Sequence, residues 1–234
     1  MMAALNNKII ALLKQEGCNI VGFADLRGLS KEARQNFDCG ILIALSYTKE
    51  AMCDNKNGMA QKYYAEFTPM NKRLSEIATL TANYLMSKGY KALAKITSTV
   101  VQDEDYRTVL PHKTVATLAG IGWIGKCATL VTSEVGSALR LVVVMTDAPF
   151  ECGTPVTESL CPPDCAVCAD VCPGKAPRPH AELWKAGMDR DTFFNAHACR
   201  TAARTHAKAA LGVNETLCGL CISNCPYTRQ GLGY

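Results

Sequence analysis

Apolar residues recur along the first 150 residues of the chain with two different spacings. Spacings of three and four residues, as at Leu74, Ile77 and Ala78, are typical of one face of a helix, whereas a continuous apolar run such as 40–46 is typical of a strand inside a sheet. These patterns predict an α/β (α+β) sandwich with a mostly buried sheet. The predicted helices are 6–15, 71–87 and 112–119, the predicted strands are 20–24, 40–46, 92–97, 128–132 and 138–146, and 55–58 is a predicted loop.

The pattern changes after Pro149, where proline, cysteine and glycine become frequent. We therefore predict an α/β domain at 1–150 and a small cysteine-rich domain at 151–234. The length of 234 residues and the hydrophobic content of 48% allow one large core and a smaller module. A net charge of +4 gives no strong indication of nucleic-acid binding. Because no apolar run is long enough to span a bilayer and no targeting segment is evident, we expect a cytoplasmic protein without a membrane partner.

Two cysteine runs, each ending in Cys-Pro, dominate the second predicted domain. The first run has the spacing Cys-x3-Cys-x2-Cys-x3-Cys-Pro, the second has Cys-x2-Cys-x3-Cys-Pro, and one more cysteine stands between them. These eight thiols are the number needed by two four-iron (4Fe-4S) clusters, and the spacing is typical of ferredoxin-like cluster loops. The predicted cluster ligands are Cys161, Cys165, Cys168, Cys172, Cys199, Cys218, Cys221 and Cys225.

The cysteine before proline in such modules usually binds the other cluster. The expected ligand sets are therefore Cys161, Cys165, Cys168 and Cys225 for one cluster, and Cys172, Cys199, Cys218 and Cys221 for the other. The first gap of the first run is three residues instead of two, so Cys161 is the least regular ligand. Structural zinc also favours Cys-x2-Cys pairs but gives no reason for the Cys-Pro endings, and disulfides would need an oxidising compartment. We expect two 4Fe-4S clusters, with zinc as the alternative.

Five of the 13 cysteines lie outside the expected ligand sets. Most of them stand among apolar residues and are predicted to be small buried side chains. Cys127 is set apart because it directly follows a glycine-rich turn. The five are Cys18, Cys39, Cys53, Cys127 and Cys152.

The glycine-rich turn is the second candidate site. Gly120, Gly122 and Gly125 permit a tight turn after a helix and let the backbone approach a flat ligand. Trp123 offers an aromatic face, and Lys126 can meet a phosphate or the carboxamide edge of a ligand. The alternative is a structural turn that packs the sheet against the second domain.

Residues 110–126 read LPHKTVATLAGIGWIGK and are followed by an apolar strand, a Gly-Ser pair, the strand LRLVVVMTD and the two cysteine runs. This order of motifs resembles the epoxyqueuosine reductase family, which is related to reductive dehalogenases. The resemblance covers 110–227, about half of the chain. It implies an α/β cobalamin-binding domain joined to a ferredoxin-like domain with two 4Fe-4S clusters. Members of that family reduce an epoxide on a modified tRNA base with a corrinoid that the clusters supply with electrons.

The resemblance also implies site residues. The acidic proton donor of the family lies shortly before a Glu-Arg pair, whose place is taken here by His112 and Lys113, and Asp105 is the acid nearest to the expected position. Asp105 and His112 are therefore the candidate catalytic residues. His112 and Lys113 join the glycine-rich turn as candidate cofactor contacts. His112 suits acid–base chemistry near neutral pH, whereas the structural alternatives are a histidine that bonds a helix end and a solvated loop around Asp105.

Two classes of function are compatible with these patterns. The first is a reductase, in which the clusters pass electrons to a corrinoid or similar cofactor that reduces a small electrophilic substrate. The second is a non-catalytic electron-transfer protein with a degenerate cofactor domain. Both would receive electrons from a donor such as ferredoxin or flavodoxin. The tRNA-reading members of the family carry a C-terminal helical-repeat region that this sequence lacks, so a small molecule is the expected substrate and tRNA is not.

Overall fold

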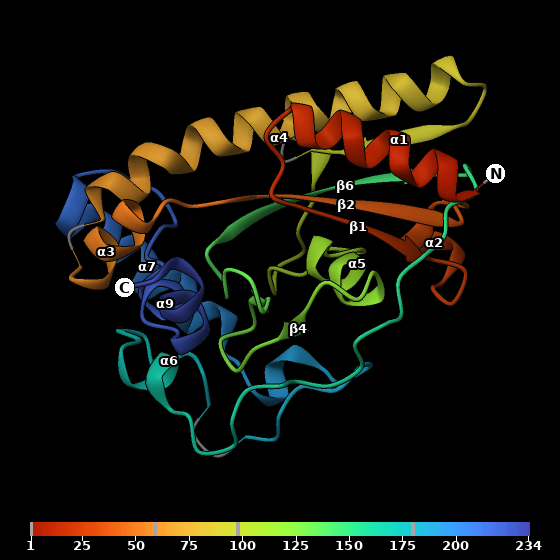
Figure 1. The fold of residues 1–234 in the computed structure, drawn as a ribbon. Coiled ribbons are helices and arrows are strands. Elements are labelled where there is room, and N and C mark those ends of the chain that lie inside the picture. Colours follow the sequence, from red (N-terminus) through yellow and green to blue (C-terminus); the bar gives the residue numbers. More distant parts are fainter. Residues whose placement is uncertain (1, 59, 97–98, 179–180) are drawn as a thin grey trace. The chain divides into compact units, whose positions relative to one another are not determined.

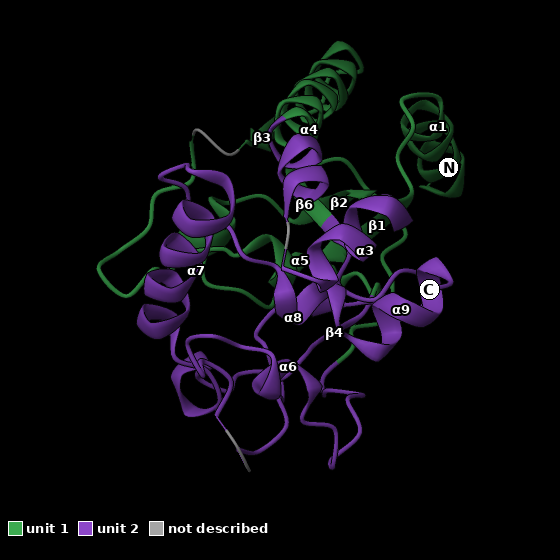
Figure 2. Cartoon of the chain, turned by 90° about the vertical axis from the view of Figure 1, so that its left-hand side faces the viewer, with its two compact units in different colours: residues 1–46, 69–121, 140–156 green, residues 47–68, 122–139, 157–234 purple. Residues whose placement is uncertain are grey.

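The structure is a computed structural model that describes residues 2–58, 60–96, 99–178 and 181–234. The chain divides into two compact units, each built from separate segments of the sequence (Figure 2). Unit one comprises 1–46, 69–121 and 140–156, and unit two comprises 47–68, 122–139 and 157–234. Unit two therefore includes two segments that precede Phe150 in the sequence, and the domain boundary near that residue stays a prediction.

Unit one contains a four-stranded sheet with the strand order β1-β2-β6-β3 (Figure 1). The β1–β2 and β3–β6 pairs are antiparallel. The protein is therefore a mixed α/β fold with a small antiparallel sheet. The elements are α1 (Met2–Gln15), β1 (Ile20–Asp25), α2 (Lys31–Arg34), β2 (Cys39–Ser46), α4 (Gln61–Ser87, from Pro69 onward), β3 (Ala92–Lys95), α5 (His112–Leu118) and β6 (Leu139–Thr146).

The core of unit one lies between one face of this sheet and the helices α1 and α4 (Figure 1). Successive residues of a strand point to opposite faces, so Ile41 and Ile43 of β2 pack in this core while the buried Leu42 faces the other side. The helix α5 packs on β1 and β2, and a Cβ atom added at Gly40 would lie 2.9 Å from the Val115 side chain of α5. Gly40 is thus required for the close approach of α5 to the sheet.

The helices and strands predicted before residue 150 are largely present, with two corrections that both fall in the part of unit two between residues 47 and 68. The predicted loop 55–58 overlaps the end of the helix α3 (Lys49–Lys56), and α4 begins at Gln61 instead of near residue 71. Residues 61–70 lack a clear apolar spacing and include Pro69, which removes one backbone donor but can be accommodated by a bent helix. The predicted end of the strand 92–97 falls on Thr97, which lies outside the described residues.

Unit two is built from short elements around the two cysteine runs. Of the predicted strand 128–132, only Leu130 and Val131 form strand, and they pair antiparallel with Trp123 and Ile124. A small core contains Ile124, Phe193 and neighbouring apolar side chains, and the helix α8 packs against α3, α6 and α9. The elements are α3, the start of α4, β4 (Trp123–Ile124), β5 (Leu130–Val131), α6 (Val167–Asp170), η2 (Arg190–Thr192), α7 (Ala196–Leu211), α8 (Leu220–Ser223) and α9 (Pro226–Leu232).

None of the helices in the described part of the chain combines the length and the apolar character needed to cross a lipid bilayer.

Candidate functional site

The eight predicted ligand cysteines all lie in unit two. The pKa of Cys168 is raised by Cys127, by burial and by the neighbouring Cys161 and Cys165, and the pKa of Cys225 is raised by burial and by neighbours that include Cys161. Cys225 belongs to the second run of the sequence but lies beside the first run in space. We call this set the first cysteine group: Cys161, Cys165, Cys168 and Cys225.

The second group is formed in the same crossed manner. Cys199 is influenced by Cys172 and Cys218, and Cys221 by Cys199 and Cys218. Cys172 comes from the end of the first run, so each run contributes its Cys-Pro cysteine to the other group. We call this set the second cysteine group: Cys172, Cys199, Cys218 and Cys221. The two groups are the ligand sets expected from the spacing, and both sets stay a prediction.

Several N–H groups are directed at sulfur atoms of both groups. The backbone N–H of Ala176 donates to Cys172 Sγ at 3.3 Å, and the indole Nε1–H of Trp123 donates to Cys161 Sγ at 3.5 Å. Backbone N–H groups also donate to Cys218 and to Cys225. Such donors stabilise a thiolate, which is the form of cysteine that binds iron or zinc.

Burial has the opposite effect on these thiols. It raises the pKa of Cys199 to about 11, helped by the neighbouring thiols of its group, and it also raises the pKa values of Cys218 and Cys225. Burial therefore favours the neutral form of these three thiols when no metal is bound. A positively charged metal centre would displace the protons, so the donor set suits a group bound through several thiolates. In the described part of the chain, no three His, Cys, Asp or Glu side chains are grouped tightly enough to hold a single metal ion.

The glycine-rich turn is divided between the units, with Gly120 in unit one and Gly122, Gly125 and its other candidate residues in unit two. A Cβ atom at Gly120 would lie 2.6 Å from the carbonyl oxygen of Thr154, and one at Gly122 would lie 2.1 Å from that of Val131. At Gly125 the same atom would meet Val131 at 2.8 Å and Cys161 Sγ at 3.5 Å. Close packing within each unit therefore accounts for glycine at these positions.

Lys126 and Trp123 are both directed at the first cysteine run. The half-buried Nζ of Lys126 donates to the carbonyl oxygen of Cys165 at 2.8 Å and also to that of Pro163. The buried Trp123 ring packs edge-on against Tyr227 with 4.9 Å between centroids, while its Nε1 reaches Cys161. These two side chains hold the cysteine loop in place, which the sequence alone did not indicate because the contacts join residues about 40 positions apart.

The predicted catalytic residues both lie in unit one. His112 opens α5, and its Nδ1 is 3.1 Å from the carbonyl oxygen of Leu141. A carbonyl only accepts, so Nδ1 carries the proton in the neutral ring, which also interacts with the backbone of Lys95. Burial lowers the pKa of His112, which favours this neutral form. Lys113 follows on α5 and is half-buried, whereas Asp105 is exposed in a turn where its backbone N–H donates to Asp103.

Cys127 of unit two was not among the ligands predicted from the spacing of the cysteine runs. Cys127 is 6% exposed, and its thiol is hydrogen-bonded to Cys168 of the first group and to Cys221 of the second. These two thiols and Thr129 hold the pKa of Cys127 well below its usual value, and the same contacts raise the pKa values of Cys168 and Cys221. The only signal in the sequence was its position after the glycine-rich turn.

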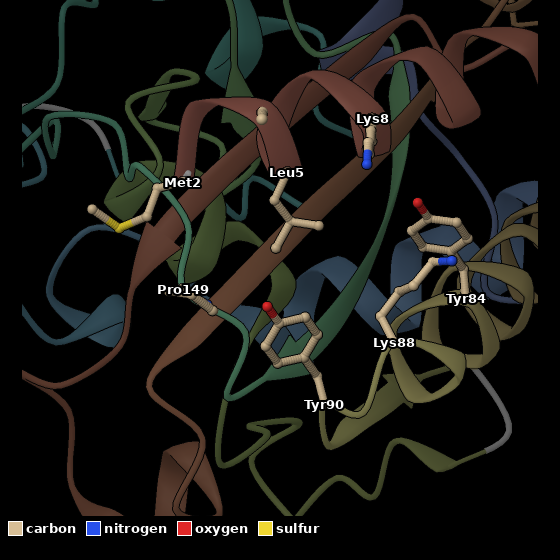
Figure 3. Close-up of a pocket in the computed structure, with 8 residues that line it drawn as sticks. Met2, Leu5, Lys8, Tyr84, Lys88, Tyr90 and Pro149 are labelled. Carbon is tan, nitrogen blue, oxygen red and sulfur yellow. The ribbon is translucent and has the colours of Figure 1, made fainter.

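A separate pocket of about 240 Å³ lies in unit one, between α1 and the end of α4 (Figure 3). The ammonium group of Lys88 lies 5.4 Å from the centroid of the Tyr84 ring beside it. The pocket contains none of the candidate residues predicted from the sequence. Its lining residues are Met2, Ala4, Leu5, Lys8, Tyr84, Lys88, Tyr90 and Pro149.

Comparison with known proteins shows what the chain is similar to. No family model matches the chain. An epoxyqueuosine reductase of Atelocyanobacterium thalassa is 30% identical over 137 residues, which cover 58% of this chain and 41% of the relative. The chain thus spans about two fifths of the length of the curated relatives that it matches.

Two solved structures show the same fold. A selenomethionine-labelled epoxyqueuosine reductase aligns with 98% of this chain and 67% of its own, with a TM-score of 0.63 and 20% identity. A reductive dehalogenase, whose structure suggests a mechanism for B12-dependent dehalogenation, aligns with 94% of this chain and 31% of its own, with a TM-score of 0.64 and 18% identity. The chain is similar in sequence to epoxyqueuosine reductases, and its fold is that of these enzymes and of reductive dehalogenases.

Proposed function

We propose that the chain is an iron–sulfur reductase whose two cysteine groups each bind a 4Fe-4S cluster. The clusters pass electrons to a corrinoid, or to a similar cofactor, which reduces a small electrophilic substrate. A donor such as ferredoxin or flavodoxin supplies the electrons. The similarity to epoxyqueuosine reductases supports the class of reaction, and the substrate of this chain is a small molecule in this proposal.

The observation that carries the proposal is that two cysteine runs with Cys-Pro endings, and the cysteine between them, bring eight thiols into unit two. Zinc sites built from adjacent Cys-x2-Cys pairs give no reason for the Cys-Pro endings. Crossed ligation is typical of two-cluster ferredoxin modules. It also holds the two clusters near each other, because each cysteine run would contribute ligands to both of them.

The residues around the thiols have defined roles in this proposal. The N–H groups of Ala176 and Trp123 donate to Cys172 and Cys161, and such hydrogen bonds compensate the negative charge of cluster thiolates. The ammonium group of Lys126 ties down the loop between Cys161 and Cys165 and brings a positive charge to the first group. Charge and hydrogen bonding at the sulfurs are the properties by which a protein sets the potential of a cluster.

The corrinoid part of the proposal rests on the shared fold. The reductive dehalogenase that aligns with 94% of this chain performs B12-dependent dehalogenation. A bound corrinoid would supply a metal centre that reduces the substrate. On the protein side, the candidate residues for proton transfer are His112, whose neutral form is favoured by burial, and Asp105, whose carboxyl group is exposed.

A second candidate function is electron transfer without catalysis. The observation in its favour is that Trp123 and Lys126 are engaged with the first cysteine run, and that Gly120, Gly122 and Gly125 face protein atoms. These residues were the expected cofactor contacts. In an electron carrier they would only hold the cluster loops in place.

An electron paramagnetic resonance experiment separates the two functions. The protein is reconstituted anaerobically with iron and sulfide, mixed with cob(II)alamin, and measured before and after reduction with dithionite. The reductase proposal predicts a cobalt spectrum that differs from that of free cob(II)alamin when the protein is present. Cluster signals accompanied by a cobalt spectrum identical to that of free cob(II)alamin would instead support the electron carrier, and the absence of cluster signals would contradict both.

A further inference from the structure

The pocket of about 240 Å³ between α1 and the end of α4 belongs entirely to unit one and contains no cysteine. Two exposed lysines line it, Lys8 from α1 and Lys88 from α4, and none of its described lining residues is acidic. Neither ammonium group forms an ion pair with an acidic residue in the described part of the chain, and that of Lys88 lies 5.4 Å from the centroid of the Tyr84 ring. The pocket therefore carries two positive charges without a counter-charge.

The lining of the pocket changes in character from one end to the other (Figure 3). The two lysines lie at the end that is marked by the Tyr84 ring, whereas Leu5, Tyr90 and Pro149 lie towards the other end, where apolar atoms predominate. Binding sites for small molecules combine an apolar lining with a few polar groups that fix the orientation of the ligand. A ligand that matches this lining is negatively charged at one end and apolar at the other.

Contacts within unit one hold the walls of the pocket in place. Leu5 and the two tyrosine rings are half-buried and pack against the main core of the unit. The side-chain amide of Asn6, next to Leu5, donates to the carbonyl oxygen of Glu151 at 2.9 Å and accepts from the backbone N–H of the same residue at 3.1 Å. These two hydrogen bonds fasten α1 to the segment that carries Pro149.

The turn after α4 is fixed in a similar way. Gly89 has a φ of 87°, which favours glycine, and it directs the chain so that Tyr90 reaches the pocket. The backbone N–H of Lys91 donates to the carboxylate of Asp147 at 2.8 Å, and the hydroxyl of Thr146 donates to the carbonyl oxygen of Lys91 at 2.7 Å. All walls of the pocket are thus tied to the sheet or to the core, so a ligand would not have to order them on binding.

The volume of the pocket limits the size of the ligand. Pockets for drug-sized ligands measure about 300–1,000 Å³, and a volume of about 240 Å³ is smaller than that range. A molecule with a single ring and a short acidic side chain fits such a volume, whereas a nucleotide does not. A bare anion such as phosphate would contact the two ammonium groups but bury none of the apolar surface at the other end, so an organic acid is favoured.

We propose that this pocket binds a small organic carboxylate with one flat apolar ring. The carboxylate lies between the ammonium groups of Lys8 and Lys88, and the ring lies against Leu5 and Tyr90. The hydroxyl of Tyr84 has no hydrogen-bond partner among the described residues, and it donates to the carboxylate. The site does not depend on clusters or on a corrinoid, because all of its residues belong to unit one.

The test is a titration of the purified full chain with sodium phenylacetate, followed by nuclear magnetic resonance of carbon-13-labelled tyrosine rings. We expect saturable shifts of the Tyr84 and Tyr90 signals, assigned with Tyr84→Phe and Tyr90→Phe, and a dissociation constant of about 1 mM for a ligand of about ten heavy atoms. The ring of Tyr63, buried in unit two, should not respond. Phenylacetamide keeps the shape without the charge, phosphate keeps the charge without the ring, and each should bind about tenfold more weakly.

Variants of the lysines locate the binding site. Lys8→Met and Lys88→Met each remove one charge and keep most of the apolar stem. Lys14→Met, at an exposed position of α1 outside the lining, makes the same change of net charge and is the matched control. Because exposed ion pairs contribute little, we expect each pocket variant to weaken phenylacetate binding by about fivefold and the control to leave it unchanged.

Several results would overturn the inference. The absence of saturable shifts of Tyr84 and Tyr90 up to about 20 mM phenylacetate would refute the site. Equal binding of phenylacetamide would show that the charge is not recognised, and equal binding of phosphate would show that the ring is not. Affinity that is unchanged in both pocket variants, or lowered equally in Lys14→Met, would place the binding outside this pocket. The comparison of the three ligands uses the unchanged protein, so it decides the matter even if a variant fails to fold.

Discussion

Replacing Lys126 with methionine is expected to weaken cluster retention at the first cysteine group. The Nζ of Lys126 donates to the carbonyl oxygens of Cys165 and Pro163, so one ammonium group fixes the loop that carries Cys161 and Cys165. Methionine has a similar length and keeps the apolar contacts of the stem, but it offers no donor. The variant therefore removes the two hydrogen bonds and the charge while leaving the packing of the stem largely in place.

The expected size of the effect follows from the hydrogen bonds. A hydrogen bond that involves a charged group contributes about 1.5–3 kcal/mol net. Because Lys126 is only half-buried, we expect its two hydrogen bonds together to contribute about 2 kcal/mol. Each 1.4 kcal/mol corresponds to about a factor of ten, so a loss of about 2 kcal/mol is a weakening of about thirtyfold. The lost free energy weakens cluster binding, because the loop has to be ordered whenever the cluster is bound.

The assay is anaerobic iron transfer from the reconstituted protein to a ferrous chelator of graded concentration. Lys126→Met should release the iron of one group at a chelator concentration about thirtyfold lower than the unchanged protein does, and the iron of the other group should be little affected. Lys208→Met, at an exposed position of α7, is the matched control and should behave as the unchanged protein. Equal iron retention in Lys126→Met and the control would refute the role of Lys126 in holding the cluster loop.

Three further results are expected. Cys218→Ala should lose about half of the iron and destabilise unit two, since cluster binding contributes to folding; full iron content by chemical analysis would contradict the assignment. Gly122→Ala would place a Cβ atom 2.1 Å from the Val131 carbonyl oxygen and should cost about 1–3 kcal/mol in thermal unfolding, whereas Gly28→Ala, with no atom within 4 Å, should cost little. Because burial lowers the pKa of His112 below 6.5, the unfolded chain binds the proton first, and stability should fall as the pH drops below 6.5. This loss of stability at low pH should be smaller in His112→Gln, and an equal loss in both proteins would contradict the burial of His112.

Local sequence patterns predicted most of unit one. The apolar runs of β2 and β6 and the helical spacing from Leu74 onward determine which face each residue presents, and the structure has these elements at the expected places. The start of α4 was missed because residues 61–70 show no apolar periodicity and contain Pro69. Helix formation there is supported by packing within unit two. The buried Tyr63 ring, for example, packs at a tilt against Tyr47 with 4.7 Å between the ring centroids, and such contacts leave no periodic signal.

The candidate site was predictable only in part, for a physical reason. The spacing of the cysteine runs is a local property; it predicted eight ligand cysteines, all of which lie in unit two, and their division into two ligand sets stays a prediction. The partners of Lys126 and Trp123 lie about 40 residues away in the cysteine loop, so the sequence favoured a cofactor role that their contacts do not require. The place of Cys127 between Cys168 and Cys221 depends on the packing of three separate segments, which no spacing rule describes.

The most direct test of the central claim is a metal and sulfide analysis of the anaerobically reconstituted protein, combined with electron paramagnetic resonance of the dithionite-reduced sample. Two four-iron clusters predict about eight irons and about eight sulfides per chain, with a broadened spectrum from two neighbouring clusters that interact. Bound zinc without sulfide, or about four irons per chain with the signal of a single isolated cluster, would contradict the claim.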